Sequence, residues 1–151
     1  MALHIATEEY FNSLEQFEQH LPENNPELII LKGHLLIERL LDKYLYINLE
    51  QPNKLNNARL TFTQKTALVS AMHHDTKCDW LWSNIKLFNQ LRNELSHNLE
   101  SDKLIKLLEN FNVSVETSPE HKENTPPNNE YTELRLSIYS LHESLSLRVN
   151  L

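Results

Sequence analysis

The chain of 151 residues contains one glycine, Gly33. Glycine allows a backbone to approach a phosphate closely and to adopt a positive φ, which side chains oppose. A chain with a single glycine therefore excludes the phosphate loops that depend on glycine, namely the Walker A loop, the dinucleotide-binding fingerprint and the kinase-type loop. It also disfavours the tight hairpin turns of an all-β fold. We expect an all-α protein.

Length, composition and charge indicate one globular domain over residues 1–151. Hydrophobic residues make up 40% of the chain and charged residues 23%, a balance typical of a protein with its own core. Fourteen basic residues stand against 21 acidic ones, so the formal net charge is −7 at pH 7. The molecule as a whole repels a polyanion, and any contact with nucleic acid must be local.

The sequence predicts a cytoplasmic protein. Cys78 is the only cysteine, so it can form neither an intrachain disulfide nor a zinc-binding pair. The apolar stretch from Leu28 to Ile47 is interrupted by charged residues, and Met1 to Phe11 lacks the pattern of a signal peptide. We expect no membrane segment, no bound metal and no cofactor.

Periodic apolar residues and capping residues predict an up-and-down bundle of about five helices. Asn25 as N-cap with Pro26 at the first helical position, and Thr61 with Gln64 as a capping box, give two clear helix starts. The expected helices span Thr7–His20, Pro26–Leu49, Thr61–His74, Asp79–Asn98 and Glu130–Leu147, with a short helix after Ser101. Residues 112–130 are expected to form a long, mobile polar loop.

The helix from Pro26 is apolar over most of its circumference, which predicts that it is the central helix of the bundle. Gly33 within it costs about 1 kcal/mol relative to alanine, so we expect another backbone to approach closely there. His34 and Glu38 lie on the face expected to be buried, where polar groups need partners. One interpretation has His34 hydrogen-bonded to Glu38, and another has Glu38 paired with Arg92.

The segment Arg92-Asn93-Glu94-Leu95-Ser96-His97 lies at the C-terminal end of the fourth expected helix. An arginine, a following polar residue and a histidine after four intervening positions resemble the motif of the HEPN superfamily, whose members are small all-α bundles. The order of elements is also similar, with a long apolar helix carrying the inward Glu38, a third helix, and then an aliphatic helix that ends in the motif. The resemblance covers about residues 27–100 and extends to the mannitol operon repressor group.

This resemblance implies a metal-independent endoribonuclease that acts as a toxin or anti-phage effector on RNA. It implies a homodimer in which two motifs face each other, and an antitoxin or similar inhibitory protein as partner. Arg92 would stabilise the phosphate, His97 would act as general acid and base, Asn93 would position the reacting groups and Glu38 would support Arg92. The residue types suit this chemistry, because guanidinium binds phosphate bidentately and imidazole exchanges protons near neutral pH.

Three alternatives stay open. Arg135 and His142 also fit the permitted spacing, although apolar Leu136 follows this arginine where Asn93 follows Arg92. On an ideal helix Arg92 and His97 point about 140° apart, so the helix end unwinds, Arg92 reaches around, or a second subunit completes the site. The alternative function is a non-catalytic, dimeric helical module that regulates transcription or binds a partner protein.

Two tryptophans stand at the start of the fourth expected helix. Trp80 and Trp82 point to different sides of it. We expect one of them in the core and the other as an anchor in an interface.

Overall fold

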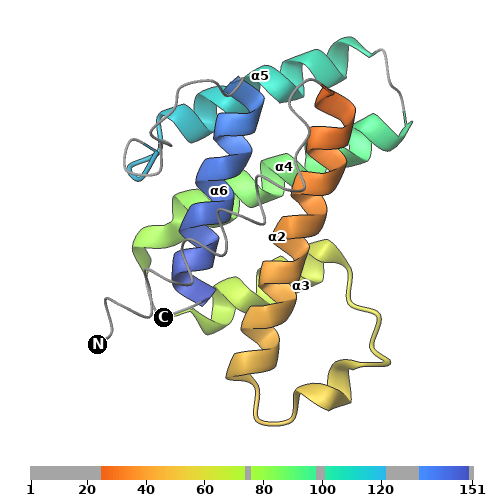
Figure 1. The fold of residues 1–151 in the computed structure, drawn as a ribbon, viewed down its shortest axis with the longest axis vertical. Helices are drawn as coiled ribbons and strands as arrows, with labels where there is room; N and C mark the ends of the chain where they lie inside the picture. The colour runs from red at the N-terminus through yellow and green to blue at the C-terminus, as the bar shows by residue number, and fades with distance from the viewer. Residues whose placement is uncertain (1–24, 74–75, 98–100, 122–132, 150–151) are drawn as a thin grey trace.

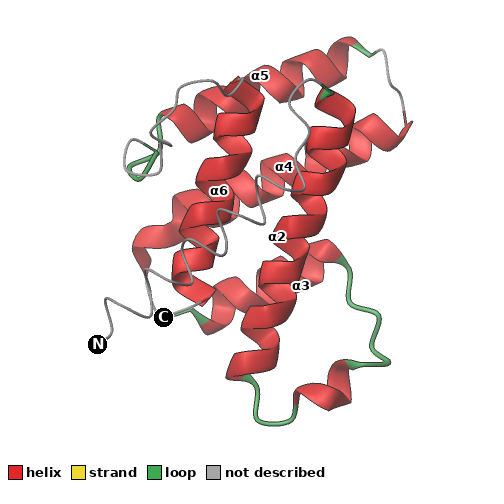
Figure 2. Ribbon diagram, in the orientation of Figure 1, coloured by secondary structure: helices red, strands yellow, loops and turns green. Residues whose placement is uncertain are grey.

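The computed structural model describes residues 25–73, 76–97, 101–121 and 133–149 (Figure 1). These residues form helices and no strand (Figure 2), so the expected all-α bundle is confirmed for this part of the chain. The elements are α2 (Pro26–Asn48), η1 (Pro52–Leu55), α3 (Phe62–Met72), η2 (Thr76–Cys78), α4 (Asp79–His97), α5 (Asp102–Glu116) and α6 (Glu133–Val149). The helix expected over Thr7–His20 lies outside the described residues. None of the described helices is both long and apolar enough to cross a membrane.

Both predicted helix starts are confirmed. The Asn25 side chain accepts a hydrogen bond of 3.2 Å from the backbone N–H of Leu28, and Pro26 follows it as the first residue of α2. At α3, the Gln64 backbone N–H donates to Thr61 Oγ1 at 3.2 Å, while the Thr61 N–H donates to Gln64 Oε1 at 3.0 Å. These caps satisfy N–H groups that a helix start otherwise leaves without partners.

Helix α5 is longer than expected. Ser101 caps it by accepting from the Leu104 N–H at 3.0 Å, and the helix continues to Glu116. The polar loop expected from residue 112 is therefore wrong over its first five residues. Phe111 and Val115, both fully buried, draw this stretch into the core as the last turns of the helix.

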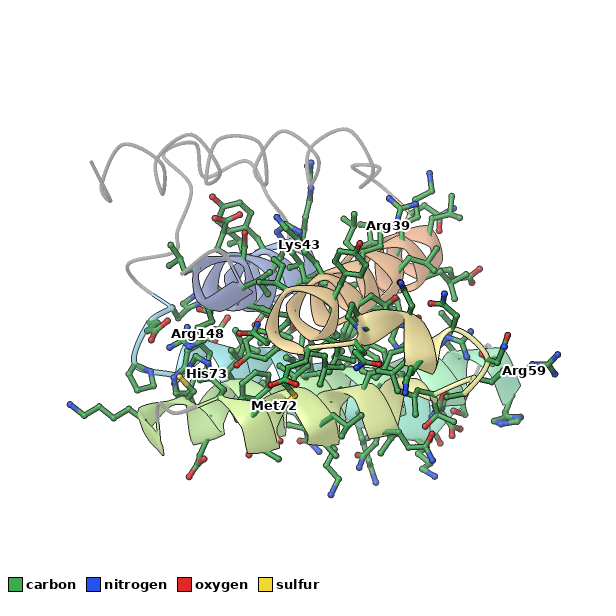
Figure 3. The ribbon with its side chains drawn as sticks, turned by 90° about the horizontal axis from the view of Figure 1, so that it is seen from below. Arg39, Lys43, Arg59, Met72, His73 and Arg148 are labelled. Carbon is green, nitrogen blue, oxygen red and sulfur yellow. The ribbon has the colours of Figure 1, made fainter. Side chains whose placement is uncertain are left out.

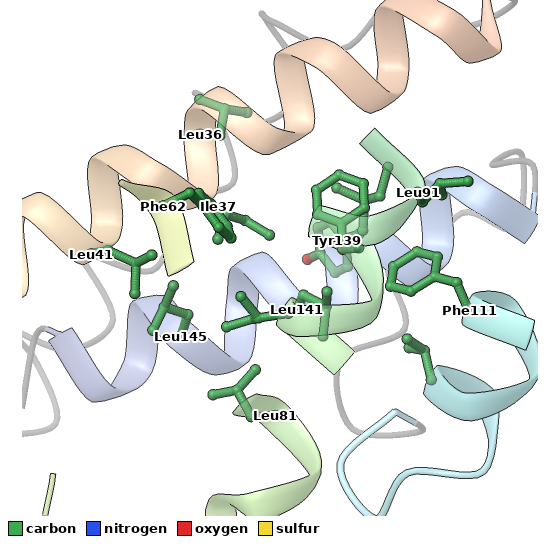
Figure 4. Close-up of a cluster of buried hydrophobic side chains, with 14 of the residues drawn as sticks. Leu36, Ile37, Leu41, Phe62, Leu81, Leu91, Phe111, Tyr139, Leu141 and Leu145 are labelled. Carbon is green, nitrogen blue, oxygen red and sulfur yellow. The ribbon is translucent and has the colours of Figure 1, made fainter. Parts of the chain in front are cut away.

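Helices α2 and α6 run side by side, and α4 crosses beneath both of them (Figures 1 and 3). Helix α5 packs on α4 and α6, and α3 packs on α2 and α4. The core forms where these helices meet (Figure 4). Its fully buried side chains include Ile37, Leu41, Leu81, Leu91, Phe111, Tyr139, Leu141 and Leu145.

Helix α6 is more deeply buried than α2, although the sequence predicts α2 as the central helix. Helix α2 leaves Leu28, Leu31 and Leu35 between 38% and 55% exposed. Helix α6 is buried along most of its length, and its polar residues are buried with it, namely Arg135, Ser137, Ser140, His142, Glu143, Ser144 and Ser146. Small serines let neighbours pack closely, and their hydroxyls find local partners, as Ser137 does with the Glu133 carbonyl at 3.0 Å.

Gly33 marks the place where α2 and α6 meet. A Cβ atom at this position would lie 2.8 Å from Ile138 Cγ2 and 3.4 Å from Phe88 Cζ. The close approach expected here is present, but a side chain of α6 makes it instead of a backbone. This tight contact fixes the position of α2 against α6. It therefore also fixes the position of the next residue, His34, in the site described below.

Candidate functional site

A hollow of about 300 Å³ opens where α2, the start of α3 and the C-terminal half of α4 meet. We call it the Arg92 hollow. Its lining residues are His34 and Glu38 from α2, Thr61, Phe62 and Thr63 from the start of α3, and Asn89, Arg92 and Asn93 from α4. Three of the residues singled out from the sequence, Arg92, Asn93 and Glu38, are thus brought together, and His97 is not among them.

Arg92 is half-buried in this hollow. Its guanidinium makes no hydrogen bond or ion pair with any of the described residues, so no carboxylate among them neutralises its charge. A guanidinium presents several N–H donors in a fixed plane and is always charged, which suits a bidentate contact with phosphate. Arg92 is therefore available to an anionic ligand.

Glu38 pairs with Lys65 of α3, so both expected partners, His34 and Arg92, were wrong. The Lys65 Nζ lies 2.9 Å from Glu38 Oε1 and 2.9 Å from Asp42 Oδ1. Glu38 and Asp42 are four residues apart on α2 and share one face, so a single ammonium reaches both. Burial lowers the pKa of Lys65, but the hydrogen bonds to the two carboxylates outweigh burial and raise that pKa above its usual value. Lys65 thus balances one of the two carboxylate charges, and neither carboxylate forms an ion pair with Arg92.

His34 forms the inner wall of the hollow. Its ring stacks on Phe62 with centroids 4.0 Å apart, and its Nε2 lies 2.9 Å from Asn89 Oδ1. The Asn89 amide in turn donates to Thr63 Oγ1 at 3.2 Å. Burial lowers the pKa of His34, and the charge of Arg92 lowers it further, against the opposing effects of Asn89 and Glu38. His34 is therefore neutral at pH 7. The contact of His34 with Asn89 joins residues 55 positions apart, and no local sequence pattern predicts it.

The positive end of α3 also faces the Arg92 hollow. Thr61, Phe62 and Thr63 line the hollow at the first turn of this helix, and the turn holds no acidic residue. The capping box uses the N–H groups of Thr61 and Gln64, while those of Phe62 and Thr63 have no backbone acceptor among the described residues. A helix start with free N–H groups favours an anion. Together with Arg92, it gives the hollow the properties of a phosphate site.

His97 lies apart from Arg92. It is the last residue of α4, its side chain is exposed, and it does not line the hollow. Helix α4 is regular through His97, so its end does not unwind, and Arg92 stays within the hollow. Within one chain the two motif residues do not converge.

The second motif candidate is buried in α6. The side chains of Arg135 and His142 are 5% and 2% exposed, and His142 Nδ1 lies 3.5 Å from Glu143 Oε1. An RNA strand cannot reach either residue while the bundle is folded. Arg92, by contrast, is only half-buried and lines an open hollow.

The buried, neutral His34 predicts an acid-sensitive fold. Because its pKa is lower in the folded chain than the usual 6.5, the unfolded chain binds more protons below pH 6.5. The stabilisation is complete above that pH and is lost as the pH falls toward the lowered value, by up to about 1.4 kcal/mol per pH unit. Urea unfolding at about pH 7.5 and about pH 5.5 measures this loss.

His34→Gln is expected to show a smaller loss of stability than the wild type, since glutamine does not titrate. His121, whose pKa burial also lowers, contributes equally to both proteins. Identical pH dependence in the two proteins would contradict the assignment to His34. His97→Ala serves as a control at an exposed histidine.

The site combines a guanidinium without an ion pair, a neutral imidazole, the Glu38 carboxylate held by Lys65, two amides and a helix start within one hollow. Among the described residues, no three His, Cys, Asp or Glu side chains gather in a way that could hold a metal ion. The arrangement can bind an oxyanion and orient it. Comparison of the chain with models of protein families, with curated proteins and with solved structures finds no match.

Proposed function

We propose that the protein is a metal-independent endoribonuclease whose Arg92 hollow binds the phosphate at the cleaved bond. One observation carries this proposal: the half-buried guanidinium of Arg92 has no acidic partner among the described residues and lies at the open first turn of α3. The resemblance of the segment from Arg92 to His97 to the HEPN motif supports it. A net charge of −7 opposes indiscriminate binding of RNA and favours a narrow substrate, such as one folded RNA.

The reaction needs proton transfer and charge stabilisation. The ribose 2′-hydroxyl attacks the adjacent phosphorus, a bond from the 2′-oxygen to phosphorus forms, and the bond to the 5′-oxygen breaks. A base takes the proton of the 2′-hydroxyl, and an acid supplies one to the departing 5′-oxygen. Arg92 stabilises the extra negative charge of the phosphorane, and Asn93 at the edge of the hollow positions the phosphate.

We assign the proton transfers to His97 of a second copy of the chain. Histidine suits this task near neutral pH, and His97 stands outside the Arg92 hollow of its own chain. The exposed Leu28, Leu31 and Leu35 of α2 support a homodimer, because such an apolar stripe is typical of a surface that a partner covers. Leu31 and Leu35 precede His34 and Glu38 by three residues each on α2, so the stripe adjoins the hollow.

The biological role that we propose is that of a cytoplasmic toxin or anti-phage effector held in check by an antitoxin or similar protein. A second function, a non-catalytic dimeric regulator or partner-binding module, is favoured by the same exposed leucines and by the separation of His97 from Arg92. Overexpression of the wild type and of His97→Ala separates the two functions. Only a ribonuclease is expected to be toxic as the wild type and harmless as His97→Ala.

The ribonuclease is tested by incubating the purified protein with total tRNA and with mRNA in the presence of EDTA. We expect cleavage by the wild type and by Arg39→Ala, in which an exposed arginine of α2 outside the hollow is removed. We expect no cleavage by His97→Ala, which should fold normally because His97 is exposed. Full activity of His97→Ala would remove this residue from the mechanism, and a wild type inactive on every RNA would favour the regulator.

A further inference from the structure

A second hollow adjoins the Arg92 hollow on the other side of the first turn of α3. It runs between α3 and α4, has a volume of about 330 Å³, and shares Phe62, Thr63 and Asn89 with the Arg92 hollow. We call it the α3–α4 groove. Its volume lies within the range of about 300–1,000 Å³ that small-molecule sites occupy. Because the two share a wall, a ligand held by Arg92 can extend directly into the groove.

The side chains of the α3–α4 groove combine flat apolar surface with hydrogen-bonding groups. Trp82 is half-buried, and its edge contact with His73, with ring centroids 6.1 Å apart, holds its ring in place (Figure 3 labels His73). Side-chain hydroxyls and an amide also line the groove, and Lys86, another lining residue, is exposed and forms no ion pair among the described residues. An aromatic face bordered by such groups is how proteins bind a nucleobase, by stacking on its plane and hydrogen bonding to its edge.

The groove and the hollow follow one face of α4. Trp82, Lys86, Asn89 and Asn93 succeed one another at intervals of four, three and four residues, which places them in line along the helix. Trp82 lies ten residues before Arg92, or about 15 Å along the axis. A strand bound along this line has a phosphate at Arg92 and a base in the groove.

We propose that the α3–α4 groove binds a nucleobase of the RNA strand whose phosphate Arg92 holds, with Lys86 contacting the stretch of backbone between the two. This inference rests on the proposed ribonuclease function and adds a base-binding subsite to it. The subsite gives a negatively charged protein a way to choose its RNA, since the base contributes affinity that does not depend on net charge.

The test measures binding apart from cleavage. The probes are two short 2′-fluoro RNAs, which lack the attacking hydroxyl, one with all bases and one with abasic positions. Fluorescence anisotropy of the labelled probes gives their dissociation constants for the full chain. We expect the wild type to bind the probe with bases about tenfold more tightly than the abasic probe.

Ala67→Leu fills the groove from an exposed position of α3 and removes no contact, so the variant should fold like the wild type. It is expected to bind both probes equally, at the affinity that the wild type has for the abasic probe. Lys106→Ala, an exposed change on α5, is the control and should retain the preference for bases.

Each failure has its own pattern. Equal binding of both probes by the wild type, weakened in Arg92→Ala, would overturn the base subsite and leave the phosphate site standing. A tenfold preference that survives in Ala67→Leu would also overturn the subsite. Absence of binding of either probe, or binding unaffected by Arg92→Ala, would overturn the subsite together with the proposed ribonuclease.

Discussion

Replacing Arg92 with alanine is expected to lower the rate of RNA cleavage by about 10²–10³-fold, the loss typical of removing one preorganised donor to a charged transition state. Arg92→Lys should recover part of this rate, because lysine restores the charge without the bidentate geometry. The guanidinium has no partner among the described residues, so its removal should change stability little. Initial rates in EDTA measure the effect, with Arg39→Ala as the matched control. A rate of Arg92→Ala within threefold of the wild type, about 0.6 kcal/mol, would contradict the role of Arg92.

Mixing Arg92→Ala with His97→Ala tests whether the two residues act across a dimer. If Arg92 of one copy works with His97 of the other, each mixed dimer regains one intact site. Random exchange makes half of the dimers mixed, so the mixture should recover about a quarter of wild-type activity. If both residues act within one chain, the mixture stays inactive. Exchange of subunits is checked with differently tagged copies, so that an inactive mixture of proven mixed dimers refutes the shared site.

Replacing Arg148 with methionine is expected to destabilise the fold by about 3 kcal/mol, near the lower end for breaking a largely buried ion pair. Arg148 lies in the last turn of α6, and its side chain reaches Cys78 at the end of η2 (Figure 3 labels Arg148). It donates to Glu120 Oε1 at 2.6 Å and Oε2 at 3.2 Å, to Cys78 Sγ at 2.6 Å and to the Ser144 carbonyl at 2.8 Å. One side chain therefore ties α6 to the turn after α5 and to η2.

Urea unfolding at neutral pH measures this loss, with Lys106→Met as the control for removing an exposed cation. The double change of Arg148→Met and Glu120→Leu should regain part of the stability, because it removes the carboxylate that the single change leaves behind. A single variant within about 0.5 kcal/mol of the wild type would show that the Arg148 contacts contribute no more than a surface change.

The sequence predicts the described helix starts well because their causes are local. Asn25 and Pro26 at α2, and Thr61 and Gln64 at α3, satisfy backbone groups within a few residues of themselves. No tertiary contact is needed to place these ends.

The deep burial of α6 could not be predicted in this way. The apolar circumference of α2 favours burial, yet α6 buries more of its length, including Ser137, Ser140 and Ser144. Their hydroxyls bond to Asn112 at 2.8 Å, His121 at 2.7 Å and Glu120 at 3.0 Å, all of them partners in or after α5. Polar composition therefore misleads where distant partners bond to buried hydroxyls.

The candidate site shows the same difference between local features, which the sequence predicts, and distant contacts, which it does not. Arg92 and Asn93 belong to one local motif, and the sequence singles them out. The partner of Glu38 is 27 residues away in Lys65, and the partner of His34 is 55 residues away in Asn89. Packing between helices decides these partners, and the spacing of residues along one helix does not predict that packing.

The packing of α2 against α6 also constrains the order in which the molecule can assemble. Helix α6 is the last of the described helices to be synthesised, and α2 precedes it by about 100 residues. The contact of α2 with α6 at Gly33 can therefore form only after residues 133–149 have left the ribosome. Since His34 and Glu38 of α2 line the Arg92 hollow, this wall of the hollow takes its final position only at that late step.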